Sequence, residues 1–240
     1  MNKNSIITAA LLLAAGSLQA ATITQTHNVA THGPGSTLDP WSDIWSFNKF
    51  DTLGGTRTLN SVRILFSVQA WGGYIGSDND GSTTANGSIS LDVNGHLSSA
   101  DVNLLDTSFQ NIWGNLLVRE LDTLSLAAND GDGAGYQVGG SDWNLLSGPI
   151  EASANSTSAD GYIADAVKSG YIGANTFSMT FTSTQVQNLL SGGSVESVIS
   201  PQTAKGVVTI TYDYIPEPAS ASLAVLVLVA GFWIRRRFID

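Results

Sequence analysis

The chain has 240 residues, with 20 Asp and Glu against 10 Lys and Arg, so its formal net charge at pH 7 is −10. The acids are scattered along the chain, and a surface of this kind repels phosphates, which excludes nucleic acid as a partner. The sequence has no cysteine, which excludes disulfides, thiolate catalysis and zinc–thiolate sites, so the core alone must hold the fold.

Residues 1–20 have the pattern of a secretion signal. Lys3 supplies a positive start, residues 6–15 are apolar, and residues 17–20 provide small side chains at which signal peptidase can cut. The apolar stretch is too short for a spanning helix. We therefore expect export by the general secretion machinery and a mature chain that begins at or next to Ala21.

Residues 21–214 show a hydrophobic period of two, which is typical of strands with one buried face. The alternating apolar positions are Val62, Ile64, Phe66 and Val68; Ile89, Leu91 and Val93; Phe177, Met179 and Phe181; and Val208, Ile210, Tyr212 and Tyr214. One-sided alternation predicts antiparallel sheets stacked on each other. The expected fold class is all-β, with a single jelly-roll-like antiparallel β-sandwich over residues 21–214.

Turn-forming residues separate these strands, and a single short helix is expected. Gly, Asn, Asp and Ser gather at residues 72–73, 77–87, 129–140 and 192–193. Residues 184–190 place Val186, Leu189 and Leu190 on one side of a helix. With no internal repeat and no linker, the body is expected to form one domain.

The opening of the body carries a recognisable pattern. Residues 47–55 read F-N-K-F-D-T-L-G-G, and residues 59–64 read L-N-S-V-R-I. This pattern resembles the start of the choice-of-anchor E domain, a family of exported bacterial domains that carry different C-terminal anchors. The family has no established activity, so the resemblance implies an exported domain and supplies no catalytic residue.

Aromatic residues next to glycines are candidates for sugar stacking. Trp71 and Tyr74 flank Gly72 and Gly73, and a turn at the glycines would expose both rings. Exposed aromatics on a β-sandwich would suit a carbohydrate-binding module, whereas the alternative is ordinary packing in the core or at a strand edge. Several tryptophans exposed in a row on one sheet face would favour the module.

Two Asp-Gly loops are weak calcium candidates. Asp78 and Asp80 lie in one, and Asp130 and Asp132 in the other, but neither loop has the first and twelfth ligands of an EF-hand. Asp and Asn beside Gly are ordinary turn residues. We therefore expect no metal site and no cofactor, and at most a modest effect of calcium on folding.

The sequence contains no recognisable catalytic motif. It lacks the Gly-x-Ser-x-Gly elbow and the glycine-rich loop with Lys-Ser/Thr, and His27, His32 and His96 have no metal-ligand spacing. Carboxylate pairs of the glycosidase type remain open as an alternative, although nothing in the sequence selects two particular acids. We expect no enzymatic activity, with an extracellular hydrolase as the alternative.

Residues 215–240 combine three elements at the C-terminus. Pro216, Glu217 and Pro218 interrupt the last strand, residues 219–234 form an apolar helix, and Arg235, Arg236 and Arg237 follow. Sixteen residues cover about 24 Å, less than the roughly 30 Å hydrocarbon layer, which suits a transient membrane stop. The basic cluster is expected to stay on the cytoplasmic side.

This order of elements resembles the PEP-CTERM sorting signal of Gram-negative bacteria. The resemblance implies processing by an exosortase near Pro216–Pro218, transient anchoring in the inner membrane, and transfer to the surface or matrix of cells that make exopolysaccharide. The expected function is that of an exported, non-enzymatic surface or exopolysaccharide-matrix protein. The alternatives are a carbohydrate-binding module, the hydrolase, and a plain single-pass anchor.

Overall fold

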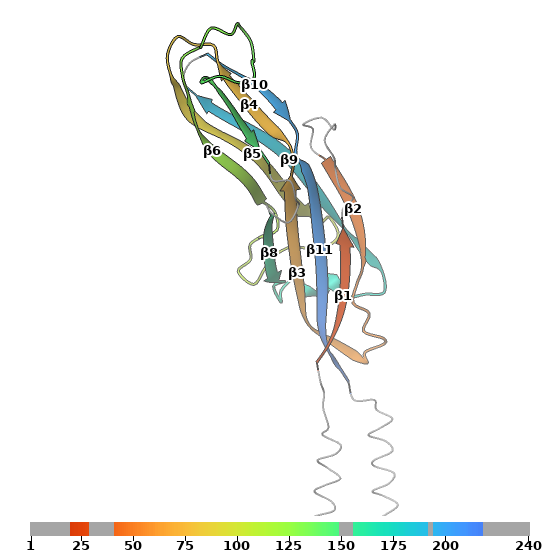
Figure 1. Cartoon of the computed structure of the whole chain (residues 1–240). Helices are drawn as coiled ribbons and strands as arrows, with labels where there is room; N and C mark the ends of the chain where they lie inside the picture. Colours follow the sequence, from red (N-terminus) through yellow and green to blue (C-terminus); the bar gives the residue numbers. More distant parts are fainter. Residues whose placement is uncertain (1–19, 29–40, 149–155, 192–193, 218–240) are drawn as a thin grey trace, which may run out of the picture.

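A computed structural model describes residues 20–28, 41–148, 156–191 and 194–217, which form an all-β body of antiparallel sheets (Figure 1). In chain order, the strands of these residues are β1 (Ala21–Asn28), β2 (Trp41–Asn48), β3 (Arg57–Trp71), β4 (Tyr74–Asn79), β5 (Ala85–Ser98), β6 (Leu116–Leu126), β7 (Trp143–Ser147), β8 (Ser156–Tyr162), β9 (Thr176–Ser191), β10 (Val195–Ser200) and β11 (Thr203–Pro216). A single 3-10 turn among them, η2, spans Lys168–Tyr171. Within these ranges, no helix has the length and apolar character needed to cross a membrane.

One layer of the body is a long ribbon with a kink. Its first part is a four-stranded sheet in the order β1-β11-β3-β8, and its second part is a three-stranded sheet in the order β10-β4-β7. The strands β3 and β11 pair up to Trp71 and Thr203, and pairing resumes at Tyr74 and Ser200. Gly73 makes the kink possible, because a Cβ there would lie 2.8 Å from the Gln202 backbone nitrogen.

The other layer is a four-stranded sheet in the order β2-β9-β5-β6. Its central pair, β5 and β9, keeps an uninterrupted antiparallel register from Gly87 opposite Ser191 to Ser98 opposite Thr180. Figure 1 shows that the body is elongated, with β1 and the end of β11 at one pole and the far ends of β4 and β10 at the other.

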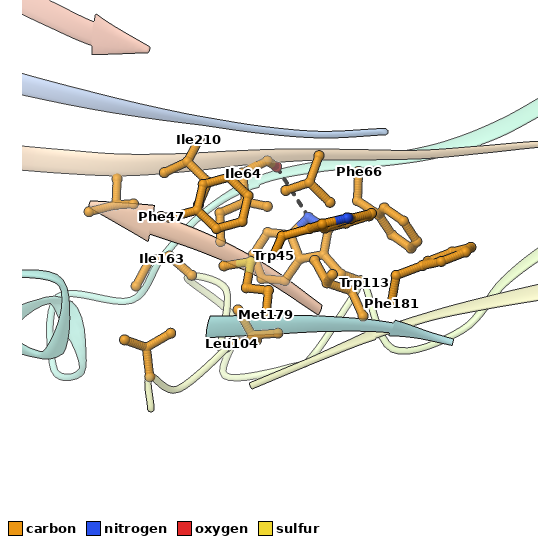
Figure 2. Close-up of a cluster of buried hydrophobic side chains, with 14 of the residues drawn as sticks. Trp45, Phe47, Ile64, Phe66, Leu104, Trp113, Ile163, Met179, Phe181 and Ile210 are labelled. Carbon is orange, nitrogen blue, oxygen red and sulfur yellow. Dashed lines mark hydrogen bonds between the residues drawn. The ribbon is translucent and has the colours of Figure 1, made fainter. Parts of the chain in front are cut away.

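The main core lies between the two four-stranded sheets. Phe66 of β3 packs against Phe181 of β9 with ring centroids 5.7 Å apart, and both side chains are fully buried. Trp113, also fully buried, donates its indole N–H to the Ile64 carbonyl at 3.1 Å (Figure 2). A buried indole with a satisfied N–H contributes a large apolar area without leaving a polar atom unpaired.

Smaller apolar clusters continue the core beyond the kink. Ile75 of β4 and Leu146 of β7 pack with Ile89 and Leu91 of β5. A third cluster joins Ala85, Leu124 and Leu126, with Leu189 and Val195 packed against it. The three-stranded sheet therefore packs on β5, a strand of the same four-stranded sheet that forms one side of the main core.

The predicted apolar strand positions are confirmed as buried, although β4 and the middle of β5 are buried on both faces rather than on one. Val62, Ile64, Phe66 and Val68 have no exposed surface, and the apolar positions predicted in β5, β9 and β11 are buried as well, except that Tyr214 is half-buried. The short helix predicted at residues 184–190 is wrong, because this segment is the second half of β9. Residues 184–191 pair with β5 in antiparallel register, whereas an isolated helix of two turns has an unfavourable free energy of nucleation.

The turn predicted at residues 77–87 is wrong at both ends. Ser77, Asp78 and Asn79 belong to β4, and β5 begins at Ala85. Asn79 and one oxygen of Asp78 are hydrogen-bonded to other parts of the chain, as described below. The turns at residues 72–73 and 129–140 are confirmed, and residues 192–193 lie outside the described residues.

Both ends of the body meet at one pole. β1 begins at Ala21, and Ala21 lies opposite Tyr214 of β11. β11 runs two residues past the predicted boundary at 214 and ends at Pro216, opposite Arg57. Residues 1–19 of the expected secretion signal (residues 1–20) lie outside the described residues, as do the expected apolar helix at 219–234 and the arginine cluster at 235–237.

Candidate functional site

Five aspartates gather at the pole opposite the chain ends, and we call this group the acidic tip. Its members are Asp78, Asp80, Asp130, Asp132 and Asp142. Asp78 lies in β4 and Asp80 directly after it, whereas the other three belong to the connection between β6 and β7. The sequence pointed to the first four, but it did not indicate that the two loops meet or that Asp142 joins them.

The β6–β7 connection folds back over the outer face of β4. The Asp80 Oδ2 accepts a hydrogen bond from the Gly135 backbone N–H at 2.9 Å, and the Asp78 Oδ2 accepts one from Gln137 N–H at 2.6 Å. Tyr136 lies between these two anchors and covers Gly76, where a Cβ would collide with its ring. The Tyr136 hydroxyl also accepts the indole N–H of Trp143 at 2.9 Å.

Further hydrogen bonds fix the base of this connection. Asn79, which is fully buried, donates to the carbonyls of Thr83 and Ala127 and accepts the N–H of Gly81. The Asn79 backbone N–H donates to the Asp142 carbonyl at 3.0 Å. Asp78 and Asp80 therefore act first as anchors for a loop, which explains why polar residues are stable inside β4.

Three carboxylates of the connection converge on one another. Asp130, Asp132 and Asp142 each offer an oxygen, and these oxygens lie within 4.8 Å of one another. Asp130 and Asp132 are exposed, whereas Asp142 is fully buried. The Asp142 Oδ2 accepts the Asp130 N–H at 2.8 Å, while its Oδ1 has no hydrogen-bond donor among the described residues.

Gly140 allows these carboxylates to approach one another. A Cβ at this position would collide with the Asp130 Oδ2 and lie 2.9 Å from the Asp142 Oδ1. The backbone φ of Gly140 is +82°, in the left-handed region that glycine adopts without strain. The two oxygens thus lie on the same side of the Gly140 backbone.

The acidic tip has no cationic partner among the described ion pairs. Those pairs join Arg63 to Asp160, Arg119 to Asp92 and Lys168 to Asp165, all away from the tip. Loss of hydration, and then the negative charges of neighbouring aspartates, raise the pKa of the Asp132 carboxyl above its ordinary value. The tip is therefore a concentrated negative charge that protein side chains leave uncompensated in the described residues.

Of the two residues predicted to stack on a sugar, only one is exposed. Tyr74 is exposed at the start of β4, but Trp71 is half-buried at the end of β3. Trp45 and Trp113 belong to the core, and Trp41 and Trp143 are half-buried. The described residues therefore present no row of exposed tryptophans.

A different pair of aromatic rings borders an open depression of about 470 Å³ beside β8. Phe109 and Tyr162 line it together with polar residues, and both rings are exposed. The remaining lining residues are Asn60, Ser61, Thr107, Ile163, Ala164, Asp165 and Ala166. Phe109 has a φ of +59°, an uncommon backbone conformation for a bulky residue, in a turn held by the Asp106 carboxylate. No sequence pattern pointed to this turn.

Part of the predicted sorting motif lies in the described residues. Pro216 is the last residue of β11, and the Glu217 backbone N–H donates to the Thr56 carbonyl at 2.9 Å. The Thr58 hydroxyl donates to the Glu217 Oε1 at 3.4 Å. Pro218, like Arg235, Arg236 and Arg237, lies outside the described residues.

Comparison with known proteins does not assign this chain to a family. No family model matches the sequence, and no curated protein matches it. Among solved structures, capsid structures of infectious bursal disease virus are similar only weakly. The Gx strain structure has 12% identity and a TM-score of 0.20, covering 83% of this chain and 38% of that chain. The T13 viral particle has 13% identity and a TM-score of 0.16, covering 81% and 36%. This chain thus spans less than half the length of these structures.

Proposed function

We propose that this protein is an exported, non-enzymatic component of the bacterial surface or exopolysaccharide matrix. Its body is a single jelly-roll-like β-sandwich of the choice-of-anchor E type. Signal peptidase removes residues 1–20, and an exosortase processes the tail at Pro216, Glu217 and Pro218. The apolar helix and Arg235–Arg237 hold the chain briefly in the inner membrane before this step.

One observation carries this proposal: the two expected processing points lie side by side at one pole. β1 begins at Ala21, directly after the expected signal cleavage, and Ala21 pairs with Tyr214, two residues before the Pro-Glu-Pro motif. The first and last strands of the described body therefore bring its two chain ends to the same pole. A body so arranged can fold outside the membrane while either end remains attached.

The described part of the motif also has the conformation that a protease requires. Peptidases bind extended chain, and Pro216 continues the extended β11 while its ring keeps a helix from starting there. Among the described residues, Glu217 is hydrogen-bonded to the body through its backbone N–H and through a long side-chain contact with Thr58. Detaching this residue from the body therefore requires little free energy.

The test is a size and fractionation blot of tail variants in an exosortase-bearing host. Glu217→Gln and Pro218→Ala should block processing and leave the chain, minus its signal, in the inner membrane. Thr58→Val is the matched control, because it removes the contact with Glu217 but leaves the motif intact, and it should be processed normally. A plain anchor is indicated instead if all three variants behave like the wild type. Mature surface protein that still carries Phe238, Ile239 and Asp240 would refute processing.

The arginine cluster provides a separate comparison. Replacing Arg235, Arg236 and Arg237 by Gln should weaken the cytoplasmic stop without changing the recognised motif. The expected result is tail slippage and a mixed distribution between membrane and medium. N-terminal sequencing of the surface form should find Ala21 or its neighbour, and Met1 on that form would contradict export by signal cleavage.

A second candidate function is carbohydrate binding at the depression beside β8. Two exposed rings, Phe109 and Tyr162, border a hollow that also contains amide, hydroxyl and carboxylate groups. This combination of apolar faces and a few polar groups suits a sugar better than the half-buried Trp71 does. Phe109→Ala and Tyr162→Ala should each weaken retention on exopolysaccharide purified from the host. Tyr74→Ala, another exposed aromatic, is the control and should change nothing.

A further inference from the structure

The acidic tip contains buried charge that the described protein atoms do not satisfy. Asp142 is fully buried and Asp78 is 1% exposed, yet the Oδ1 of each has no hydrogen-bond donor. A buried carboxylate oxygen without a donor is costly, and native proteins rarely keep one unless an ion or water occupies the site. The unsatisfied Asp142 carboxylate also belongs to the cluster of three acids, and this combination indicates a ligand of positive charge.

The geometry directs the free Asp142 oxygen toward the other acids. The Asp142 Oδ1 and the Asp130 Oδ2 lie on the same side of Gly140. Asp132 offers a carboxylate oxygen within 4.8 Å of one oxygen of Asp130 and one oxygen of Asp142. A cation placed among three carboxylate oxygens at such separations can reach all three at ordinary metal–oxygen distances of about 2.3–2.6 Å. Asp78 lies one strand away and anchors the same loop.

The frame around these acids is preorganised. The Asp142 Oδ2 holds the Asp130 N–H, Asn129 holds the Gly131 N–H at 2.6 Å, and Asp80 holds the Gly135 N–H. The loop is thus turned toward the carboxylates by its own hydrogen bonds. A Cβ at Gly140 would occupy the space between two of the carboxylate oxygens.

The donor set selects a hard divalent cation. All the candidate ligands are oxygens, and the cluster contains no His or Cys. Magnesium requires a near-ideal octahedron and retains its waters, whereas calcium accepts irregular sets of six to eight oxygens, including loop carbonyls and water. A loop with two exposed acids and one buried acid fits calcium better.

We propose that the acidic tip binds one calcium ion through Asp130, Asp132 and Asp142, which ties the first turn of the β6–β7 connection to the last residue of the same connection. The loop of Asp130 and Asp132 does not have the ligands of an EF-hand; the site forms because the fold brings Asp142, at the other end of the connection, against these two acids. Binding is weak, with a dissociation constant on the order of 0.1–1 mM, as in extracellular calcium modules. The site does not depend on how the chain is exported.

The test uses the full-length chain purified in detergent and stripped with chelator. Calcium is titrated by calorimetry, and terbium is titrated with excitation of Trp143, which directly follows Asp142. The expected results are saturable calcium binding, indole-sensitised terbium emission that calcium displaces, and a melting temperature about 3–7 °C higher in 10 mM calcium. Magnesium at the same concentration should leave the melting temperature unchanged.

Variants assign the effect to the site. Asp132→Asn changes an exposed side chain and should leave the fold intact while weakening calcium binding at least about tenfold. Asp142→Asn should weaken it more. Asp122→Asn, an exposed acid on β6, is the matched control and should bind like the wild type. The proposal fails if the wild type binds no calcium at 10 mM, if magnesium substitutes equally, or if Asp132→Asn binds as tightly as Asp122→Asn.

Discussion

The Asp142 carboxylate accepts the backbone N–H of Asp130 at 2.8 Å with one oxygen and leaves its other oxygen buried without a donor. One side chain thus both holds the β6–β7 connection in place and introduces an uncompensated negative charge. In the presence of calcium, this buried negative charge becomes favourable because the ion compensates it. Without calcium, it destabilises the fold.

The first prediction is that the effect of Asp142→Asn on stability changes sign when calcium is added. The amide oxygen can still accept the Asp130 N–H, and the amide N–H₂ can donate toward the Asp130 carboxylate. In chelator, the variant should be more stable than the wild type by about 0.5–1.5 kcal/mol, and in 10 mM calcium it should be less stable. Urea unfolding in both buffers measures this. An equal change in stability in both buffers would show that Asp142 does not bind calcium.

The second prediction concerns the buried indole of the main core. Trp113→Phe keeps an aromatic ring but removes the hydrogen bond to the Ile64 carbonyl and leaves a void. It should lower the free energy of unfolding by about 2–3 kcal/mol. Trp143→Phe is the comparison, because it removes an indole hydrogen bond at the half-buried tip and should cost less than about 1 kcal/mol. Equal losses would contradict the placement of Trp113 at the centre of the core.

The third prediction tests the contact between the two layers. Gly95 of β5 lies against Val68 of β3, and a Cβ on Gly95 would collide with the Val68 side chain. Gly95→Ala should therefore destabilise the protein by about 1–3 kcal/mol through overpacking. Val68→Ala opens the space, so the double variant should be less destabilised than the sum of the single variants. Strict additivity would show that these side chains do not touch.

The fourth prediction follows from the ion pair between β3 and β8. The guanidinium of Arg63 donates to Asp160 at 2.8 Å through Nε and holds the pKa of the Asp160 carboxyl below its ordinary value. The pair therefore contributes stability above pH 3.8, and this contribution is lost as the pH falls through the lowered pKa of the folded state. Arg63→Gln should reduce stability at neutral pH and raise the pH of acid unfolding. Circular dichroism across an acid titration checks this, with Arg57→Gln as the control.

The buried faces of β3, β5, β9 and β11 could be predicted from the sequence alone. Alternation of apolar and polar residues is a local property, so Val62 to Val68 and Phe177 to Phe181 already indicated which face is buried and that the sheets stack. The same local logic placed the turn at Gly72 and Gly73. The resemblance of the tail to a sorting signal rests on a contiguous motif as well, so it needs no tertiary structure to be proposed.

Only the tertiary structure decided what the acids do and what residues 184–190 become. The Asp78 carboxylate meets Gln137, 59 residues away, and Asp142 joins Asp130 and Asp132 only because the connection folds back over β4. The spacing of the Asp-Gly loops lacks the ligands of an EF-hand, and it carried no information on a cluster that Asp142 completes from the other end of the same connection. Residues 184–190 form a strand for the same reason: the long-range pairing with β5 supplies more backbone hydrogen bonds than a short helix can make alone.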